Sequence, residues 1–314
     1  MTVGEDTGRQ PSVESETRRT LAVFPGQGSQ RPGMAAWITE FPAAVRVFRQ
    51  ADEVLGIPLT ALCVDGTAEQ LRATDVAQPA IVATSLALSA VYAERGARPA
   101  AVAGHSLGEF TALAVAGALD IETVLRLVRR RGELMAAAAR RYDGAMSAVI
   151  GLPAEQVGTL CAQVDSGVVG VANFNQPTQT VVSGATPAVA DLEARARAAG
   201  AAKVVRLKVS GAFHSPLMAE IAAEFGAELD RCDLRPPHTN VLSAVTADYV
   251  TEPTEIRALL RHQLLAPVRW VETVRRAAAD GYDELVELGP GQVLTGFSRR
   301  IVPALSSSAI SAPG

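Results

Sequence analysis

The sequence predicts an α/β protein built from a large subdomain with a parallel sheet and a smaller, inserted subdomain. A G-x-S-x-G pentapeptide at residues 104–108 lies between a short apolar run and an Ala/Leu-rich helical stretch, which is the strand–turn–helix context of a nucleophile elbow. Residues 144–208 follow the order βαββαβ, which is that of a ferredoxin-like unit. The 314 residues, 48% of them hydrophobic, can bury a large core in one or two domains.

Five segments divide the chain. Residues 1–19 are polar and charged, with no apolar core of signal-peptide length, and predict a disordered tail. The large subdomain comprises residues 20–139 and 210–305, and the small subdomain, residues 140–209, is inserted between these two parts. Residues 306–314 are small and polar and predict a frayed end.

The elements follow from apolar runs and helical periodicity. Short apolar runs predict buried strands, and Ala/Leu-rich stretches with a 3.6-residue period predict helices. Proline near a helix start and glycine after its end mark the boundaries. The expected strands are 21–24, 100–103, 145–150, 168–173, 178–183, 203–207 and 282–288, and the expected helices are 41–55, 78–96, 109–118, 121–139, 154–164, 187–199 and 293–301.

The composition excludes several classes of function. A net charge of −4 and a pI of about 5.7 leave no broad basic field for nucleic acid. The three cysteines are far apart and form neither a metal-binding spacing nor a disulfide framework, which fits the reducing cytoplasm. The longest apolar-biased run, residues 79–91, contains polar side chains and is too short to span a bilayer. We therefore expect a cytoplasmic protein without a metal, membrane or nucleic-acid partner.

Ser106 is the candidate nucleophile. It lies on the sharp turn of the elbow, where a side chain at Gly104 or Gly108 would collide with the neighbouring backbone. The start of the next helix leaves the Leu107 N–H without an intrahelical partner and directs a positive dipole end to the same place. A carbonyl attacked by Ser106 would develop its negative charge there. The alternative is an ordinary serine on a Gly-rich turn.

Residues 25–33 form a Gly-rich loop after the first strand. The loop lacks the third glycine of a dinucleotide fingerprint and the Gly-Lys-Ser/Thr of a phosphate-binding loop. Its backbone N–H groups, that of Gln27 among them, could instead converge on a developing anion. Spacing alone favours a plain surface turn.

Arg131 is an anomaly on its helix. On a helical wheel it lies in the middle of the buried stripe, together with Val128 and Met135. A buried guanidinium needs a carboxylate, which either another residue or a ligand can supply. The residue types leave both partners open, with the internal carboxylate slightly favoured.

His214 is the best candidate for a general base among the four histidines. It lies in a Gly-rich turn before a helix. His105 neighbours the serine and is expected to point elsewhere. His238 and His262 are expected to be exposed and structural.

Several motifs occur in one order along the chain. They are Phe24–Gln30 (FPGQGSQ), Gln78-Pro79, Gly104–Glu109 (GHSLGE), Arg131-Gly132 with Met135, Asn173-x-Asn175, Phe213-His214, Pro267–Trp270 (PVRW) and Glu287–Gly291 (ELGPG). Over residues 20–302 they resemble the malonyl-CoA:acyl carrier protein transacylases of fatty-acid synthesis and the discrete, trans-acting acyltransferases of polyketide assembly lines. The resemblance implies an α/β-hydrolase-like large subdomain, a ferredoxin-like small subdomain and a cleft between them.

The resemblance also implies catalytic roles. Ser106 would be the nucleophile and His214 its base. The backbone N–H groups of Gln27 and Leu107 would form the oxyanion hole. Arg131 would hold the free carboxylate of the malonyl group as a two-pronged pair.

Positioning and pocket roles follow from the same resemblance. The backbone carbonyl of Gln263 would orient the base, in place of the acid of a Ser-His-Asp triad. Phe213, Met135, Asn175 and His105 would line the substrate pocket. Phe213 is typical of malonyl-specific modular domains, whereas methylmalonyl domains tend to have Ser, and the large ring leaves less room at the malonyl C2.

The implied activity is transfer of a malonyl group from malonyl-CoA to the phosphopantetheine thiol of an acyl carrier protein. It proceeds through a malonyl-serine ester in a ping-pong reaction, in a monomer without a bound cofactor or metal, in fatty-acid or polyketide biosynthesis. The alternatives are transfer of a substituted malonyl unit, hydrolysis of acyl chains from carrier proteins, and a catalytically idle docking module of a polyketide synthase complex.

Two further features of the resemblance concern contacts that take no part in the reaction. Ala266 replaces an Asn of many relatives, which leaves one loop contact in question. Carrier proteins are usually acidic, so docking needs a local basic patch. The candidates are Arg126, Arg129 and Arg130, or Lys203, Arg206 and Lys208, and both clusters are also simple solvated faces.

Overall fold

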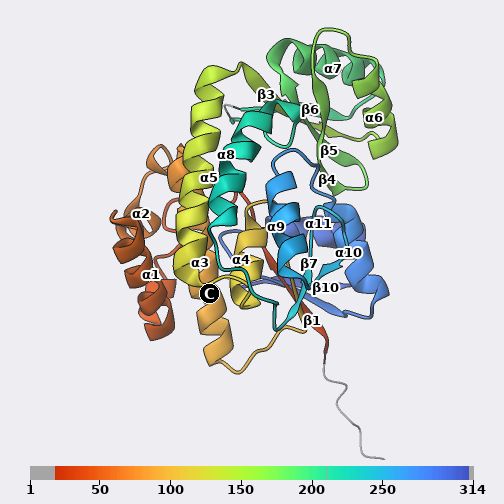
Figure 1. Ribbon diagram of the computed structural model, residues 1–314. Coiled ribbons are helices and arrows are strands. Elements are labelled where there is room, and N and C mark those ends of the chain that lie inside the picture. Colours follow the sequence, from red (N-terminus) through yellow and green to blue (C-terminus); the bar gives the residue numbers. More distant parts are fainter. Residues whose placement is uncertain (1–17, 210, 311–314) are drawn as a thin grey trace, which may run out of the picture.

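Two β-sheets organise the chain. The computed structural model describes residues 18–209 and 211–310, so residues 1–17 of the predicted tail, Ser210 and the last four residues lie outside the description. Figure 1 shows the smaller sheet at the upper end of the molecule and the larger sheet at the lower end.

The larger sheet has six strands in the order β10-β9-β1-β2-β7-β8. Neighbouring strands are parallel except for the β7–β8 pair, which is antiparallel. The central strand β1 is buried at every residue, as expected for a parallel strand covered on both faces. The strands are β1 (Thr20–Phe24), β2 (Ala101–Gly104), β7 (Asn240–Leu242), β8 (Tyr249–Val250), β9 (Glu284–Glu287) and β10 (Ser306–Ala309).

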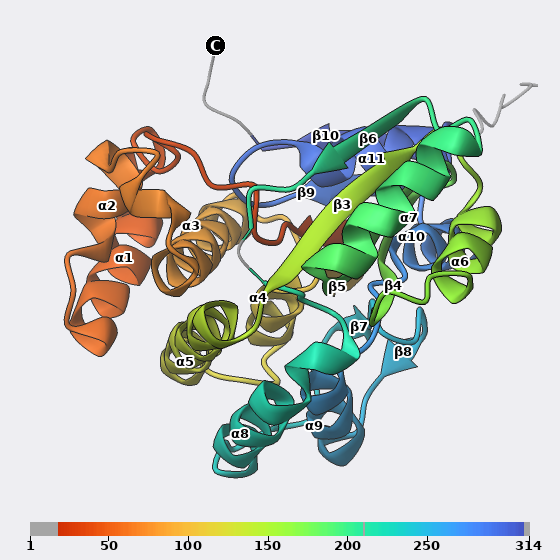
Figure 2. The ribbon, with the colours of Figure 1, turned by 90° about the horizontal axis from the view of Figure 1, so that it is seen from above.

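Helices of the large unit cover this sheet. Among them, α3 packs against α1 and α5, and Figure 2 shows α1, α2 and α3 grouped at one side of the molecule. The helices are α1 (Pro42–Leu55), α2 (Leu59–Asp65), α3 (Thr74–Glu94), α4 (Gly108–Val115), α5 (Ile121–Arg141), α8 (Ala219–Asp230), α9 (Pro253–His262), α10 (Trp270–Ala279) and α11 (Val293–Ile301), with 3-10 turns η1 (Ile38–Glu40), η2 (Gln70–Arg72) and η3 (Pro216–Met218).

The smaller sheet is antiparallel, in the order β4-β5-β3-β6. Its strands and two helices alternate along the chain as β3, α6, β4, β5, α7 and β6, which is the predicted βαββαβ order. The elements are β3 (Gly144–Ile150), α6 (Ala154–Ala162), β4 (Val169–Gln176), β5 (Gln179–Ala185), α7 (Thr186–Ala198) and β6 (Lys203–Arg206).

Helix α3 corrects one prediction. The helix begins at Thr74, earlier than the apolar run indicated, and its 21 residues are long and apolar enough to cross a membrane by length and composition. However, 78% of its most apolar window is buried inside the protein. The helix lies in the largest hydrophobic cluster, beside α1 and α5, so its apolarity is that of a core helix.

The frayed end predicted from residue 306 is wrong for residues 306–309. These residues form β10, which pairs in parallel with β9. The Thr295 hydroxyl of α11 donates a hydrogen bond to the Ser308 carbonyl at 3.1 Å and so holds the strand from one side. Small polar residues carry little strand signal of their own, and here the free edge of β9 supplies the hydrogen-bonding partners.

Candidate active site

Ser106 lies on the tight turn between β2 and α4. Its backbone has φ of 51°, a left-handed conformation that non-glycine residues rarely adopt. A Cβ added at Gly104 would lie 2.0 Å from the Gly108 carbonyl carbon, and one at Gly108 would lie 2.0 Å from the Phe24 carbonyl oxygen. Both glycines are therefore required, as the elbow interpretation predicted.

His214 meets the serine from a segment 108 residues further along the chain. Its Nε2 lies 2.8 Å from Ser106 Oγ. Its Nδ1 donates to the backbone carbonyls of Gln263 and Ala266, at 2.9 and 3.0 Å. Because two carbonyls require a donor at Nδ1, Nε2 is left to accept the serine proton. The Ala266 contact uses the backbone, so the loss of an Asn side chain at this position leaves it intact.

Burial and charge keep the imidazole neutral. Burial and, to a smaller extent, the nearby Arg131 cation lower the pKa of His214 to about 4, although the hydrogen bonds to the two carbonyls act in the opposite direction. At neutral pH the ring is unprotonated, which is the form a general base needs.

Arg131 is 1% exposed, and no carboxylate of the described residues lies within 4.0 Å of it. Its Nη1 donates to Gln78 Oε1 at 3.0 Å, and Nη2 donates to Gln263 Oε1 at 3.1 Å and to Ser106 Oγ at 3.2 Å. Its Nε has no partner in the described part of the chain. Burial lowers the pKa of Arg131 to about 10, so the side chain stays cationic at neutral pH. A cation with a spare N–H beside the serine can receive a ligand carboxylate.

Glu109 is the site residue that sequence reasoning missed. Its side chain is 3% exposed and accepts a hydrogen bond from Gln263 Nε2 at 2.7 Å, while Gln263 Oε1 accepts from Arg131. One amide thus links the buried Glu109 carboxyl group to the buried Arg131 cation. Burial raises the pKa of Glu109, and hydrogen bonds from Ser243 and Gln263 and the Arg131 charge oppose that rise. The GHSLGE motif contains Glu109, but no local pattern indicated its role, because its partner Gln263 lies 154 residues further along the chain.

The two expected oxyanion donors flank the serine. The backbone N–H groups of Gln27 and Leu107 make no hydrogen bond within the described residues. The Gln27 side chain donates to Thr74 Oγ1 at 3.2 Å, which fixes its loop against the start of α3. Two free N–H groups near one nucleophile can stabilise an oxyanion.

A cavity of about 100 Å³ opens beside the nucleophile. It is lined by predicted residues from every part of the site, namely Gln27, His105, Ser106, Arg131, Met135, Phe213 and His214, and by Asn173 and Met146 of the smaller sheet. Asn175 instead lines a neighbouring cavity of about 200 Å³, where its Oδ1 lies 2.8 Å from His105 Nε2. Both cavities lie between the two sheets, and His105 borders each of them.

Three further observations concern the other titratable side chains. Burial lowers the pKa of His105, so this ring is neutral as well. His238 and His262 are absent from both cavities. Within residues 18–209 and 211–310, no group of three His, Cys, Asp or Glu side chains is placed to hold a metal ion.

Comparison with known proteins identifies the class. The model of the acyl transferase domain family matches residues 22–308. The match covers most of the chain, including both sheets and the serine elbow. The fold and the site are thus those of an acyltransferase.

Named relatives show to which family of acyltransferases the chain belongs. Malonyl CoA-acyl carrier protein transacylase of Haemophilus influenzae is 43% identical, over 93% of this chain and 95% of the relative, and that of Bacillus subtilis is 40% identical, over 93% of each. A solved acyl carrier protein S-malonyltransferase from Vibrio cholerae has a TM-score of 0.91 at 39% identity, covering 94% of this chain and 97% of that one. The chain belongs to the malonyl CoA-acyl carrier protein transacylase family.

Two further matches involve polyketide synthesis. A malonyl-transacylase solved in complex with a type II polyketide acyl-carrier protein has a TM-score of 0.91 at 40% identity, covering 94% of this chain and 96% of that one. The polyketide biosynthesis protein ThaF of Burkholderia thailandensis is 41% identical, over 90% of this chain and 24% of that protein.

Proposed function

We propose that this chain moves a malonyl group from malonyl-CoA to the phosphopantetheine thiol of an acyl carrier protein. The observation that carries the proposal is the buried Arg131, whose Nη2 lies 3.2 Å from the oxygen of Ser106 and whose Nε has no partner among the described residues. A guanidinium at this distance from a nucleophile favours an acyl group that ends in a carboxylate.

The first half-reaction forms an ester on the serine. His214 Nε2 takes the hydroxyl proton as Ser106 Oγ attacks the thioester carbonyl. The negative charge on the carbonyl oxygen is held by the N–H groups of Gln27 and Leu107. The C–S bond then breaks, the proton passes from His214 to the departing sulfur, and free CoA leaves a malonyl-serine ester.

The second half-reaction reverses these steps with a different thiol. His214 accepts the proton of the phosphopantetheine thiol, and the sulfur attacks the ester carbonyl. The C–O bond breaks, and Ser106 recovers its proton from His214. The backbone carbonyls of Gln263 and Ala266 hold the imidazole in one tautomer throughout.

Arg131 selects the acyl group in this scheme. An acetyl group would leave the guanidinium buried without a counter-charge, whereas the malonyl carboxylate pairs with it. The Phe213 ring, 6% exposed at the cavity wall, restricts substituents at C2 of the acyl group. Malonyl is therefore the preferred substrate over its C2-substituted relatives.

The named relatives support both settings of the reaction, fatty-acid and polyketide synthesis. The match to a carrier-protein complex of a type II polyketide system supports an acyl carrier protein as the acceptor. We place the enzyme in the cytoplasm as a monomer that needs no bound cofactor. A panel of acyl-CoA substrates with one carrier protein, read by mass spectrometry, tests the choice of acyl group, and free malonate as the main product would instead indicate a hydrolase.

The decisive experiment is intact-mass measurement after incubation with malonyl-CoA. The wild-type chain should gain one malonyl group, and Ser106→Ala should gain none. Arg131→Ala should lose malonyl transfer by roughly thirtyfold or more, because a buried charge pair is lost, and gain relative activity with acetyl-CoA. Arg126→Ala is the matched control, since this exposed arginine of the same helix pairs with Glu122. A stable malonyl adduct on Ser106→Ala protein would overturn the proposal.

A further inference from the structure

A groove of about 430 Å³ adjoins the active site on the side of η2. Three cations line it, and they come from separate parts of the chain: Arg31 from the loop after β1, Arg72 from the end of η2, and Lys208 from the segment after β6. No acidic residue is among the described residues that line the groove. The groove is therefore locally positive on a chain whose net charge is −4.

These three cations have no anionic partner. Arg31, Arg72 and Lys208 form no ion pair or side-chain hydrogen bond within the described residues. Lys208 is also one of two lysines in a chain that otherwise uses arginine. Their positive charges are exposed at one groove and are therefore available to an anionic ligand.

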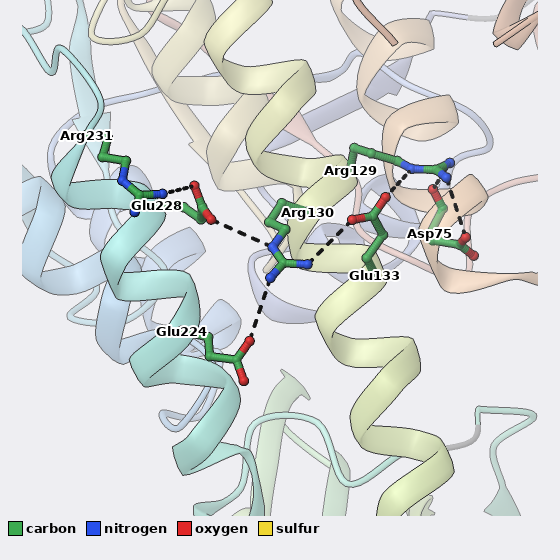
Figure 3. Close-up of polar contacts among 7 residues, drawn as sticks. All are labelled: Asp75, Arg129, Arg130, Glu133, Glu224, Glu228 and Arg231. Atoms are coloured by element: carbon green, nitrogen blue, oxygen red, sulfur yellow. Dashed lines mark hydrogen bonds and ion pairs between the residues drawn. The ribbon is translucent and has the colours of Figure 1, made fainter. Parts of the chain in front are cut away.

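The arginine cluster on the outer face of α5 is different. Figure 3 shows Arg129 and Arg130 among carboxylates of α3, α5 and α8. Arg129 contacts Glu133 at 2.8 Å and Asp75 at 3.8 Å, and Arg130 lies 3.7–3.8 Å from Glu133 and from two glutamates of α8. These arginines are already neutralised, so this face offers little charge to an anionic ligand.

The groove and the catalytic cavity share part of their lining. Gln27, Leu207 and Val209 line both spaces. A thioester whose acyl end reaches Ser106 can therefore extend past Gln27 into the groove. The distal part of a CoA thioester carries a diphosphate and a ribose phosphate, which are the groups that arginine and lysine recognise best.

We propose that Arg31, Arg72 and Lys208 form a binding site for the phosphate groups of the acyl-CoA donor. The inference rests on the proposed function, because it takes the donor to be a CoA thioester. The shared chemistry is a phosphate on a pantetheine arm, which the carrier protein also supplies as a phosphodiester. We assign the groove to CoA because CoA brings three phosphates to three cations.

The test compares donors with and without phosphates. The triple variant Arg31→Ala, Arg72→Ala, Lys208→Ala should raise the KM for malonyl-CoA roughly tenfold or more, since three charge-assisted contacts are lost. Its kcat should stay near the wild-type value, and its KM for malonyl-pantetheine, which lacks phosphates, should be unchanged. The salt dependence of the KM for malonyl-CoA should also flatten. Arg126→Ala is again the control.

Three outcomes would overturn the assignment. The KM for malonyl-CoA could be unchanged, the KM for malonyl-pantetheine could rise equally, or the KM for the carrier protein could rise alone, which would indicate carrier docking. Calorimetric binding of CoA to Ser106→Ala protein with and without the triple change needs no acyl transfer. It therefore separates failure of the groove from failure of the proposed reaction.

Discussion

At the scale of single residues, the site depends on polar side chains that other protein groups hold in place. His214 is held between the serine and two backbone carbonyls, and Arg131 is held by Gln78, Gln263 and the serine. The cation that would receive the substrate also sets the proton affinity of the base. A change of charge at Arg131 should therefore change the pKa of His214.

The acylation rate should depend on pH through His214. The base works unprotonated, so kcat/KM should fall as pH drops through about 4, the pKa to which burial and Arg131 lower this ring. Removing the cation in Arg131→Ala should raise that pKa and move the acidic limb to higher pH. Stopped-flow measurement of acylation by acetyl-CoA over a pH series gives the acidic limb of the wild-type protein and that of the variant. An identical limb in the variant would contradict the electrostatic coupling.

Glu109 should act through Gln263. Glu109→Ala removes one of the two acceptors of the Gln263 amide nitrogen and the carboxyl group that raises the pKa of Arg131, so we expect a loss of roughly 1–3 kcal/mol in unfolding free energy and weaker malonyl transfer. Glu109→Gln keeps an acceptor oxygen and should retain most of both. Urea unfolding and kcat/KM for malonyl-CoA give the two readouts. Equal losses in both variants would show that the Gln263–Glu109 hydrogen bond contributes to neither stability nor activity.

At the scale of elements, the elbow is defined by the close approach of α4 to β1 and β2. A Cβ at Gly104 or Gly108 would lie within 2.0 Å of backbone atoms, and backbone cannot move aside as a flexible side chain can. The G-x-S-x-G pattern predicted that neither position tolerates alanine. The packing of a helix start against two parallel strands is what excludes it.

Two glycine-to-alanine variants test whether close contact with backbone atoms is what requires glycine. Gly108→Ala should unfold the protein or abolish acylation, because its Cβ would overlap the Phe24 carbonyl. Gly158→Ala in α6 meets no atom within 4 Å and should stabilise the protein by about 0.5–1 kcal/mol, since alanine favours helix. Urea denaturation followed by circular dichroism compares them. A stable, active Gly108→Ala protein would refute the elbow packing.

At the scale of the whole molecule, the site is shared among three stretches of chain. Ser106 and Arg131 precede the smaller sheet, Asn173 and Met146 belong to it, and His214 follows it. Strand β4 of the smaller sheet is joined beside the cavity to the segment between α9 and α10, where Phe174 N donates to Val268 O and Val268 N donates to Ala172 O, both at 2.9 Å. The cavity therefore exists only when both units are folded and joined.

Cysteine labelling should report this global fold. Cys63 is fully buried between α2 and α3, and burial raises the pKa of its thiol to about 12, so it should react only when the molecule unfolds. Cys161 and Cys232 are half-buried and should react faster. Mass spectrometry of thiol alkylation over a urea series measures each site. Cys63 reacting as fast as Cys232 in native buffer would contradict a single cooperative core.

Much of this architecture could be predicted from local patterns. The glycines around Ser106, the position of Arg131 in a buried helical stripe, the βαββαβ order and the shortage of competing histidines are all visible within short windows of sequence. The elbow pattern itself pointed to the Leu107 N–H. The resemblance to a known family favoured an oxyanion role for Gln27 over a plain turn, and it added the expected role of Gln263, which no spacing in this chain would have indicated.

The tertiary structure decided those features that depend on contacts between distant segments. Edge pairing makes β10 a strand although its residues have little strand preference, the core covers α3 although its composition would suit a membrane, and folding brings Glu109, Gln263 and Arg131 into one hydrogen-bonded chain. Each outcome depends on a partner far away in sequence. Patterns within a helix or strand determine which face is buried, whereas only packing between distant segments determines what that face meets.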